Sequence, residues 1–242
     1  MRQRKFWIIV AVVLAVGFLQ MPATASAEKI QGQKRMIIVD DTFRFVPGTW
    51  GDYTLVDKAK KASYHLVLSI LNDERVRARD YAWMQIRIDM KGKPSVVTQV
   101  LVEKTVQGPG DIQKAIVQIT GFDPFTVPEK YLKGKEGQVT PSEKYRIVER
   151  VKRQEVTFKG KTIQLWKVRA ATKGGKRAVV WVSEKILPLG IYKVDIPEYG
   201  MYLNDWGTGA KSEIKGKPMN FYLWIAKMIG SAISKGMTEP EK

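Results

Sequence analysis

The chain has 242 residues, no cysteine, a single histidine and a formal net charge of +17. The absence of cysteine excludes disulfides, cysteine-ligated zinc and a lipid anchor on an N-terminal cysteine. One histidine also excludes sites built from several histidines. The surplus of positive charge favours anionic partners such as lipid headgroups or acidic envelope polymers.

The first 27 residues have the organisation of a secretory signal peptide. Basic residues precede an uncharged apolar run over 6–19, and Ala25-Ser26-Ala27 matches a cleavage site. The apolar run is shorter than the roughly 20 residues that span a membrane. We therefore expect cleavage after Ala27, a periplasmic location, and a mature chain of 215 residues with a charge of +14. Export argues against nucleic acid as a partner.

Strands are predicted along most of the mature chain, because β-branched and aromatic residues alternate between Gly- and Pro-containing turns. The expected strands cover 36–39, 53–56, 63–71, 81–90, 95–103, 112–120, 145–159, 162–171, 178–183, 191–194 and 199–204. The short connections favour an antiparallel meander. Residues 72–80 are expected to form a charged connector with at most one helical turn, and 121–140 to form a surface loop, a lid or a seam between subdomains.

Two of these strands predict a shared apolar face. In 81–90 the even-numbered positions are apolar, and in 95–103 the even-numbered positions from 96 to 102 are apolar or Thr. Such alternation is typical of a half-buried antiparallel strand. We expect these side chains to line the apolar face of a curved sheet.

The end of the chain changes to a helical period. Residues 218–235 place one apolar side on a helix, with Leu223 and Trp224 at its edges. This side comprises Phe221, Tyr222, Ile225, Met228, Ile229, Ala232 and Ile233. We predict an α+β protein, mainly antiparallel β, with a curved sheet or half-open barrel over 28–216. The amphipathic helix and tail at 217–242 are expected to cover it.

Catalytic motifs are weak. His65 lies within a strand pattern, which favours a structural role. Ser212-Glu213-Ile214-Lys215 matches S-x-x-K without the motifs that accompany it, and Gly160-Lys161-Thr162 is expected to be a hairpin turn. Asp40, Asp41 and Asp52 supply carboxylates for a hydrolase, since acid–base hydrolysis requires only two suitably spaced carboxyl groups.

A basic stretch runs from Lys144 to Arg177, with twelve Lys or Arg and two acidic residues. Arg150, Lys152 and Arg153 are its candidate anion-binding face. The alternative is that these charges keep exposed strands from pairing with other molecules. Both interpretations remain open.

The stretch from Trp181 to Gly207 resembles exported proteins of the outer-membrane lipoprotein-sorting type. The likeness rests on Trp181-Val182-Ser183, the turn Pro188-Leu189-Gly190, the strand after it and the strand that ends near Gly207. It extends loosely over 80–210. The resemblance implies a half-open barrel whose concave apolar face is covered by helices. It also implies a lipid or a lipid-modified protein as partner.

From these observations we expect a non-enzymatic envelope protein that carries or senses a hydrophobic, anionic ligand without a cofactor. The ligand is expected to contact the concave face and the helix through Ile86, Ile88, Val100, Val102, Trp166, Trp181, Phe221, Ile225 and Met228. One alternative is an interaction or regulatory module with a filled core, partnered by an envelope protein or an anionic membrane surface. Another is a carboxylate-based hydrolase.

Overall fold

The structure is a computed structural model of the chain, and it describes residues 38–39, 42–106, 108–133, 144–172 and 174–236. The expected signal peptide lies outside the described residues. So do Asp40, Asp41 and residues 134–140 of the irregular segment.

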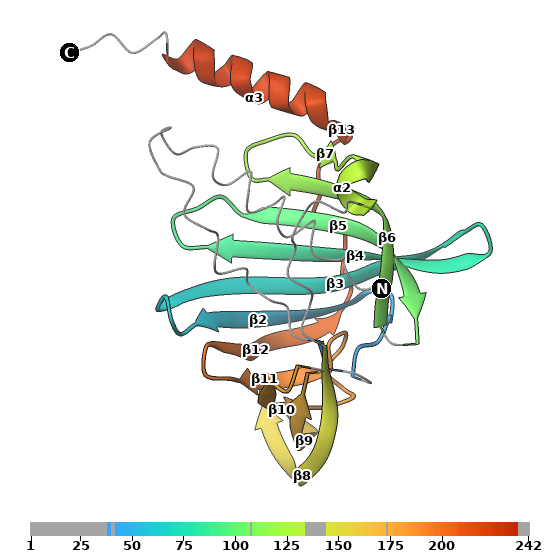
Figure 1. The fold of residues 1–242 in the computed structure, drawn as a ribbon, viewed down its shortest axis with the longest axis vertical. Coiled ribbons are helices and arrows are strands. Elements are labelled where there is room, and N and C mark those ends of the chain that lie inside the picture. The colour runs from blue at the N-terminus through green and yellow to red at the C-terminus, as the bar shows by residue number, and fades with distance from the viewer. Residues whose placement is uncertain (1–37, 40–41, 107, 134–143, 173, 237–242) are drawn as a thin grey trace.

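Strands dominate the described chain (Figure 1). They are β1 (Ile38–Val39), β2 (Thr49–Asp57), β3 (Ala62–Val76), β4 (Arg79–Met90), β5 (Val96–Thr105), β6 (Gly108–Ile119), β7 (Phe125–Thr126), β8 (Lys144–Phe158), β9 (Lys161–Ala171), β10 (Arg177–Val182), β11 (Ile191–Asp195), β12 (Tyr199–Thr208) and β13 (Met219–Asn220). The helices are α2 (Glu129–Lys133) and α3 (Phe221–Gly236).

These strands form one open sheet in the order β1-β8-β9-β10-β11-β12-β2-β3-β4-β5-β6-β7-β13. The two-residue strand β1 pairs in parallel with β8, and the other twelve strands make up the main sheet. Pairing is antiparallel except at the two ends, where β13 also runs parallel to β7. The predicted fold class, a mainly antiparallel open sheet with a C-terminal helix, is confirmed.

The sheet is strongly curved at its β8 end. The turn between β8 and β9 reaches β12, which lies four strands away in the sheet order. There the Lys159 ammonium is 2.7 Å from a carboxylate oxygen of Asp205, and the Phe158 ring centroid is 5.7 Å from that of Trp206. Such coiling follows from the right-handed twist of strands.

Strand register aligns apolar residues across the sheet into one continuous apolar face. Cross-strand rows connect Val180 of β10 to Tyr64 of β3 through β11, β12 and β2. The face is formed by Val168, Val180, Val194, Met201, Leu203, Tyr53, Leu55, Leu66, Leu68, Ile70, Ala82, Met84, Ile86, Val100, Val102, Ala115 and Val117, which belong to the buried core. The opposite side, the polar face, carries Asp52, Thr54, His65, Arg87 and Asp89 at the intervening positions.

The segment 72–80 differs from the predicted connector. β3 and β4 continue through it as a long hairpin, which closes at Arg77 and Ala78 with φ angles of 48° and 62°. Its residues are charged because the hairpin extends beyond the body of the sheet, where both faces meet water (Figure 1). The composition of this segment resembles that of a loop, so its strands are recognised only from the pairing of β3 with β4.

Candidate functional site

The apolar face contains the first group of predicted ligand residues. Ile86 and Val102 lie in the core on β4 and β5, Val100 is 1% exposed, and Ile88 is partly buried beside them. Among the described elements, no helix makes an extensive contact with β2, β3, β4 or β5. The side chains that alternate in 81–90 and 95–103 thus lie on one surface of the sheet, as the sequence predicted.

A cationic rim lies at the β8 end of the same face. Trp166 of β9 is directly opposite Val182, on the side that carries Val168. The guanidinium groups of Arg150 and Arg153 lie 5.4 and 5.8 Å from the centroid of the Trp166 indole ring. A β-bulge between positions 150 and 152 lets both arginines reach the same ring.

The predicted basic face is divided by this bulge. Lys152 is paired with Lys167 on the opposite side of the hairpin, away from Arg150 and Arg153. The three residues therefore do not form one surface, because the extra residue shifts the alternation of side chains.

Trp181 also lies on the polar face, not with the other predicted ligand residues. It alternates with the buried Val180 and Val182. The ammonium groups of Lys167 and Lys193 lie 5.4 and 5.1 Å from its ring centroid. Cation–π contacts of this kind explain its position without a ligand.

The helix residues form a third, separate group. Phe221, Ile225 and Met228 pack against the core, and Trp224 is their buried anchor. However, α3 contacts mainly the edge strands β7 and β13, and Figure 1 shows it beyond that edge. The placement of these residues as a lid over Ile86 and Val100 is therefore corrected, because the strap before α3 leads to the far edge of the sheet.

A groove of about 270 Å³ lies where α3 begins, between α2, β6 and β7. Its lining is mixed, with apolar side chains from α2 and α3 and the ammonium-bearing side chain of Lys114. It is separate from the apolar face and belongs to the β7–β13 edge.

Two buried hydroxyls on the apolar face, those of Tyr199 and Tyr53, are unusual because neither has a hydrogen-bond partner among the described residues. Tyr53 is the more deeply buried of the two and is 0% exposed. Burial, and to a smaller extent the charge of Asp52, raises the pKa of this phenol far above its ordinary value, so it stays neutral. An unpaired buried hydroxyl costs about 1–3 kcal/mol. It is therefore a candidate contact for a polar atom of a ligand.

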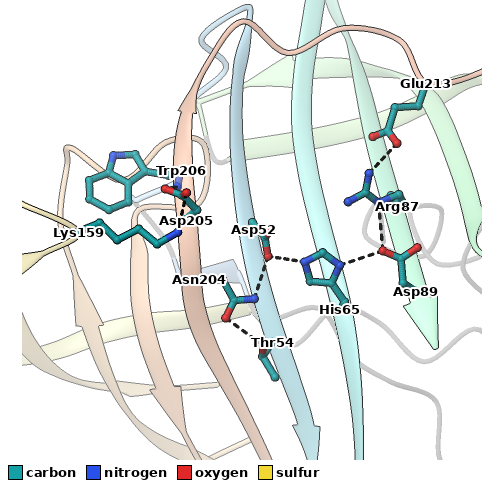
Figure 2. Close-up of polar contacts among 10 residues, drawn as sticks. All are labelled: Asp52, Thr54, His65, Arg87, Asp89, Lys159, Asn204, Asp205, Trp206 and Glu213. Carbon is teal, nitrogen blue, oxygen red and sulfur yellow. Dashed lines mark hydrogen bonds and ion pairs between the residues drawn. The ribbon is translucent and has the colours of Figure 1, made fainter. Parts of the chain in front are cut away.

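The polar face holds a chain of charges centred on His65 (Figure 2). His65 Nε2 is 2.7 Å from Oδ1 of Asp52, and Nδ1 is 2.9 Å from Oδ2 of Asp89. Arg87 continues the chain from Asp89 to Glu213, with Nη1–H donating to Oε2 of Glu213 at 2.8 Å. Both ring nitrogens face carboxylates, an arrangement that favours the protonated form of the imidazole.

The pKa shifts of His65 and Asp89 follow from the ion pairs and hydrogen bonds around them. Partial burial lowers the pKa of His65, but its bonds to Asp89 and Asp52 and their charges outweigh this and raise it above the ordinary value. For Asp89, burial raises the pKa, while bonds from Ser95 and His65 and the charge of Arg87 lower it overall. Asp52 also accepts a bond from Nδ2 of Asn204 at 2.8 Å. These contacts join four strands and indicate a structural role.

Replacing His65 with glutamine is expected to flatten the dependence of stability on pH above pH 6. A raised pKa in the folded state means that His65 stabilises fully below its unfolded pKa of about 6.5, and that this contribution is lost as the pH rises through its folded pKa. Since half-exposed pairs contribute little, we expect a change below about 1 kcal/mol. Urea unfolding at pH 6, 7.5 and 9 measures it. Equal slopes for both proteins would contradict the assignment, because no other histidine is present.

A strap over 209–218 crosses the polar face between β12 and β13. Three glutamines on successive strands hold it: Gln85 and Gln99 bond Glu213 and Ser212, and Gln118 bonds both the N–H and the C=O of Lys215. The S-x-x-K match at Ser212 is thus part of a structural strap. Gly160, at a φ of 73°, forms the turn between β8 and β9, as predicted.

Sequence reasoning missed the glutamine contacts. A polar amide in the middle of three apolar strands was the available signal, since a buried amide needs partners. The sequence could not show which residues these amides bond, because partners such as Gln85 and Glu213 are 128 residues apart.

Within the described ranges, no group of three or more His, Cys, Asp or Glu residues is arranged to hold a metal ion. No helix there is both long enough and apolar enough to cross a membrane. Fold and faces together define a curved, open antiparallel-sheet protein with one apolar face and a cationic rim. No protein-family model and no curated protein matches the chain.

Proposed function

We propose that this chain is a non-enzymatic envelope protein that carries or senses a lipid-like ligand with an anionic headgroup. The observation that supports this most is the continuity of the apolar face with the Arg150–Trp166–Arg153 rim. Burying an acyl chain on that face is favourable at roughly 25 cal/mol per Å² of apolar area. Guanidinium groups at its end suit phosphate or carboxylate.

Three further features agree with the proposal. The Tyr53 hydroxyl lies on the same face, where an ester or hydroxyl oxygen of the ligand would satisfy it. The signal-like N-terminus predicts export to the compartment in which such lipids are handled. The resemblance to lipoprotein-sorting proteins implies the same class of ligand.

The test begins with protein purified from the envelope of its producing cell without detergent. Organic extraction followed by mass spectrometry is expected to give near-equimolar lipid. Tyr53→Phe is expected to lower ligand content without loss of stability, because it removes only an unpaired hydroxyl. A clean extract, with no later uptake of a fluorescent fatty acid, would overturn the proposal.

The headgroup assignment has a matched control on the same strand. Arg150→Gln combined with Arg153→Gln removes both cations from Trp166 and is expected to reduce the content of anionic lipid. Lys152→Gln lies on the other side of β8 and is expected to change nothing. Equal ligand loss in both proteins would show that general charge, not the rim, attracts the ligand.

A second candidate is an interaction module with a filled core. The observation that favours it is the complete burial of Leu68 and Met84, which are 0% exposed. Ala115→Leu separates the two functions. In a filled core, the larger side chain is expected to lower the free energy of unfolding by about 1–3 kcal/mol. In a ligand site, it is expected to displace the ligand and leave the stability of the ligand-free protein unchanged. Lys114→Leu, on the opposite face of β6, is the control.

A further inference from the structure

The helix α3 carries two apolar stripes, of which one is used inside the protein. Phe221, Trp224, Ile225 and Met228 are spaced i, i+3, i+4 and i+7 and face the core. The second stripe contains Tyr222, Leu223 and Ile229, which are 50%, 66% and 56% exposed. Such a stripe on a helix that projects from the sheet edge is costly to leave in water (Figure 1).

The second stripe continues onto α2. Tyr131 is exposed, and its ring centroid lies 5.8 Å from that of Phe221. The Lys130 ammonium lies 4.9 Å from the ring of Tyr131 and 5.3 Å from that of Tyr222, so one cation joins the two helices. Four of the eight exposed large apolar residues in the described chain thus form one patch, which we call the edge patch: Tyr131, Tyr222, Leu223 and Ile229.

The charges around the edge patch select its partner. The sequence of α3 contains two lysines and no acidic residue, with Lys227 paired to Asp123, and the mature chain is expected to carry +14. Tyrosines and lysines beside exposed aliphatic side chains are typical of helices that lie in the headgroup region of a bilayer. With 16 residues, α3 is too short to cross the hydrocarbon core, which takes about 20.

We propose that the edge patch docks this protein onto an anionic phospholipid surface, with α3 lying in the plane of the interface and Leu223 and Ile229 inserted. This inference rests on the proposed function in one respect: a carrier or sensor of lipid must meet a membrane. The docked surface belongs to the β7–β13 edge. It is separate from the apolar face and its rim, where the ligand is proposed to bind.

The test is flotation of the purified full chain with vesicles of phosphatidylcholine containing about 30% phosphatidylglycerol, and with vesicles of phosphatidylcholine alone. We expect binding to the anionic vesicles that weakens with salt. Leu223→Asp combined with Ile229→Asp is expected to weaken binding at least tenfold. Both residues are exposed, so the sheet stays folded.

The control is Val148→Asp on β8. Val148 is 69% exposed, so this substitution also replaces an exposed apolar residue with aspartate, but far from the edge patch. Equal weakening by this control, or no preference for anionic vesicles, would overturn the proposal. So would an edge-patch variant that binds normally. A dimer in sedimentation that the same variant abolishes would assign the patch to a second copy and also overturn it.

Extraction of lipid from the edge-patch variant distinguishes the two proposals. Ligand content unchanged with vesicle binding lost supports docking at the edge and carriage elsewhere. Vesicle binding in wild-type protein that contains no ligand would overturn the carrier function and leave docking intact.

Discussion

Replacing Trp224 with alanine is expected to release α3 from the sheet edge while the sheet stays folded. Trp224 is 2% exposed, its ring centroid lies 4.5 Å from that of Phe125, and its Nε1–H donates to the Asp123 carbonyl at 3.0 Å. Tryptophan-to-alanine changes at buried sites cost about 3–5 kcal/mol. Because α3 meets mainly β7 and β13, the contacts that remain are those of the partly buried Phe221, Ile225 and Met228 and the exposed Lys227–Asp123 ion pair.

The consequence is local, because a helix of this length is marginally stable in water on its own. Hydrogen exchange is expected to show loss of protection over α3, with β2 to β5 unchanged. Ile229→Ala removes a side chain of similar apolar character from the exposed stripe and should leave protection intact. Full protection of α3 in the Trp224 variant would show that another contact anchors the helix.

Replacing Gly190 with alanine is the second change with a large expected effect. Gly190 has a φ of 71°, and a Cβ atom there would lie 2.7 Å from both Cβ and the backbone oxygen of Thr42. The left-handed conformation costs a non-glycine residue about 1–2 kcal/mol, and forced overpacking adds about 1–3 kcal/mol. We expect a total loss of about 2–5 kcal/mol in urea unfolding.

The matched control is Gly175→Ala, in the turn between β9 and β10. Gly175 has a φ of 80° but no atom within 4 Å of its Cβ position, so only the conformational cost remains. The difference between the variants measures the close approach of the 183–190 turn to Thr42, where Oγ1–H also donates to the Leu189 carbonyl at 2.7 Å. Equal losses would show that this approach is not tight in solution.

Local spacing of side chains explains why much of the fold was predictable. The expected strands at 81–90, 95–103 and 162–171 correspond to β4, β5 and β9, and the expected helix at 218–235 corresponds to α3. Alternation and helical period depend on backbone geometry within a few residues. Both are visible in a single sequence.

The candidate sites were predicted less well, since a strand's register decides which residues meet. Alternation placed Ile86 and Val100 on one apolar surface correctly. It could not foresee the bulge that puts Arg150 and Arg153 on Trp166 while turning Lys152 away. Nor could it show that Asp52 and Asp89 enclose His65, because these carboxylates come from two neighbouring strands.

Tertiary contacts also decided which residues of the C-terminal helix are buried. Its periodicity allowed a broad apolar side, with Trp224 at the margin. Contact with Phe125 made Trp224 the anchor and left Tyr222 and Ile229 in solvent. The sequence by itself determined most of the strands, the apolar face and the C-terminal helix, because these depend on local spacing. Only the tertiary structure decided the cationic rim, the His65 chain and the edge patch, because contacts between distant residues depend on register, bulges and the path of the strap.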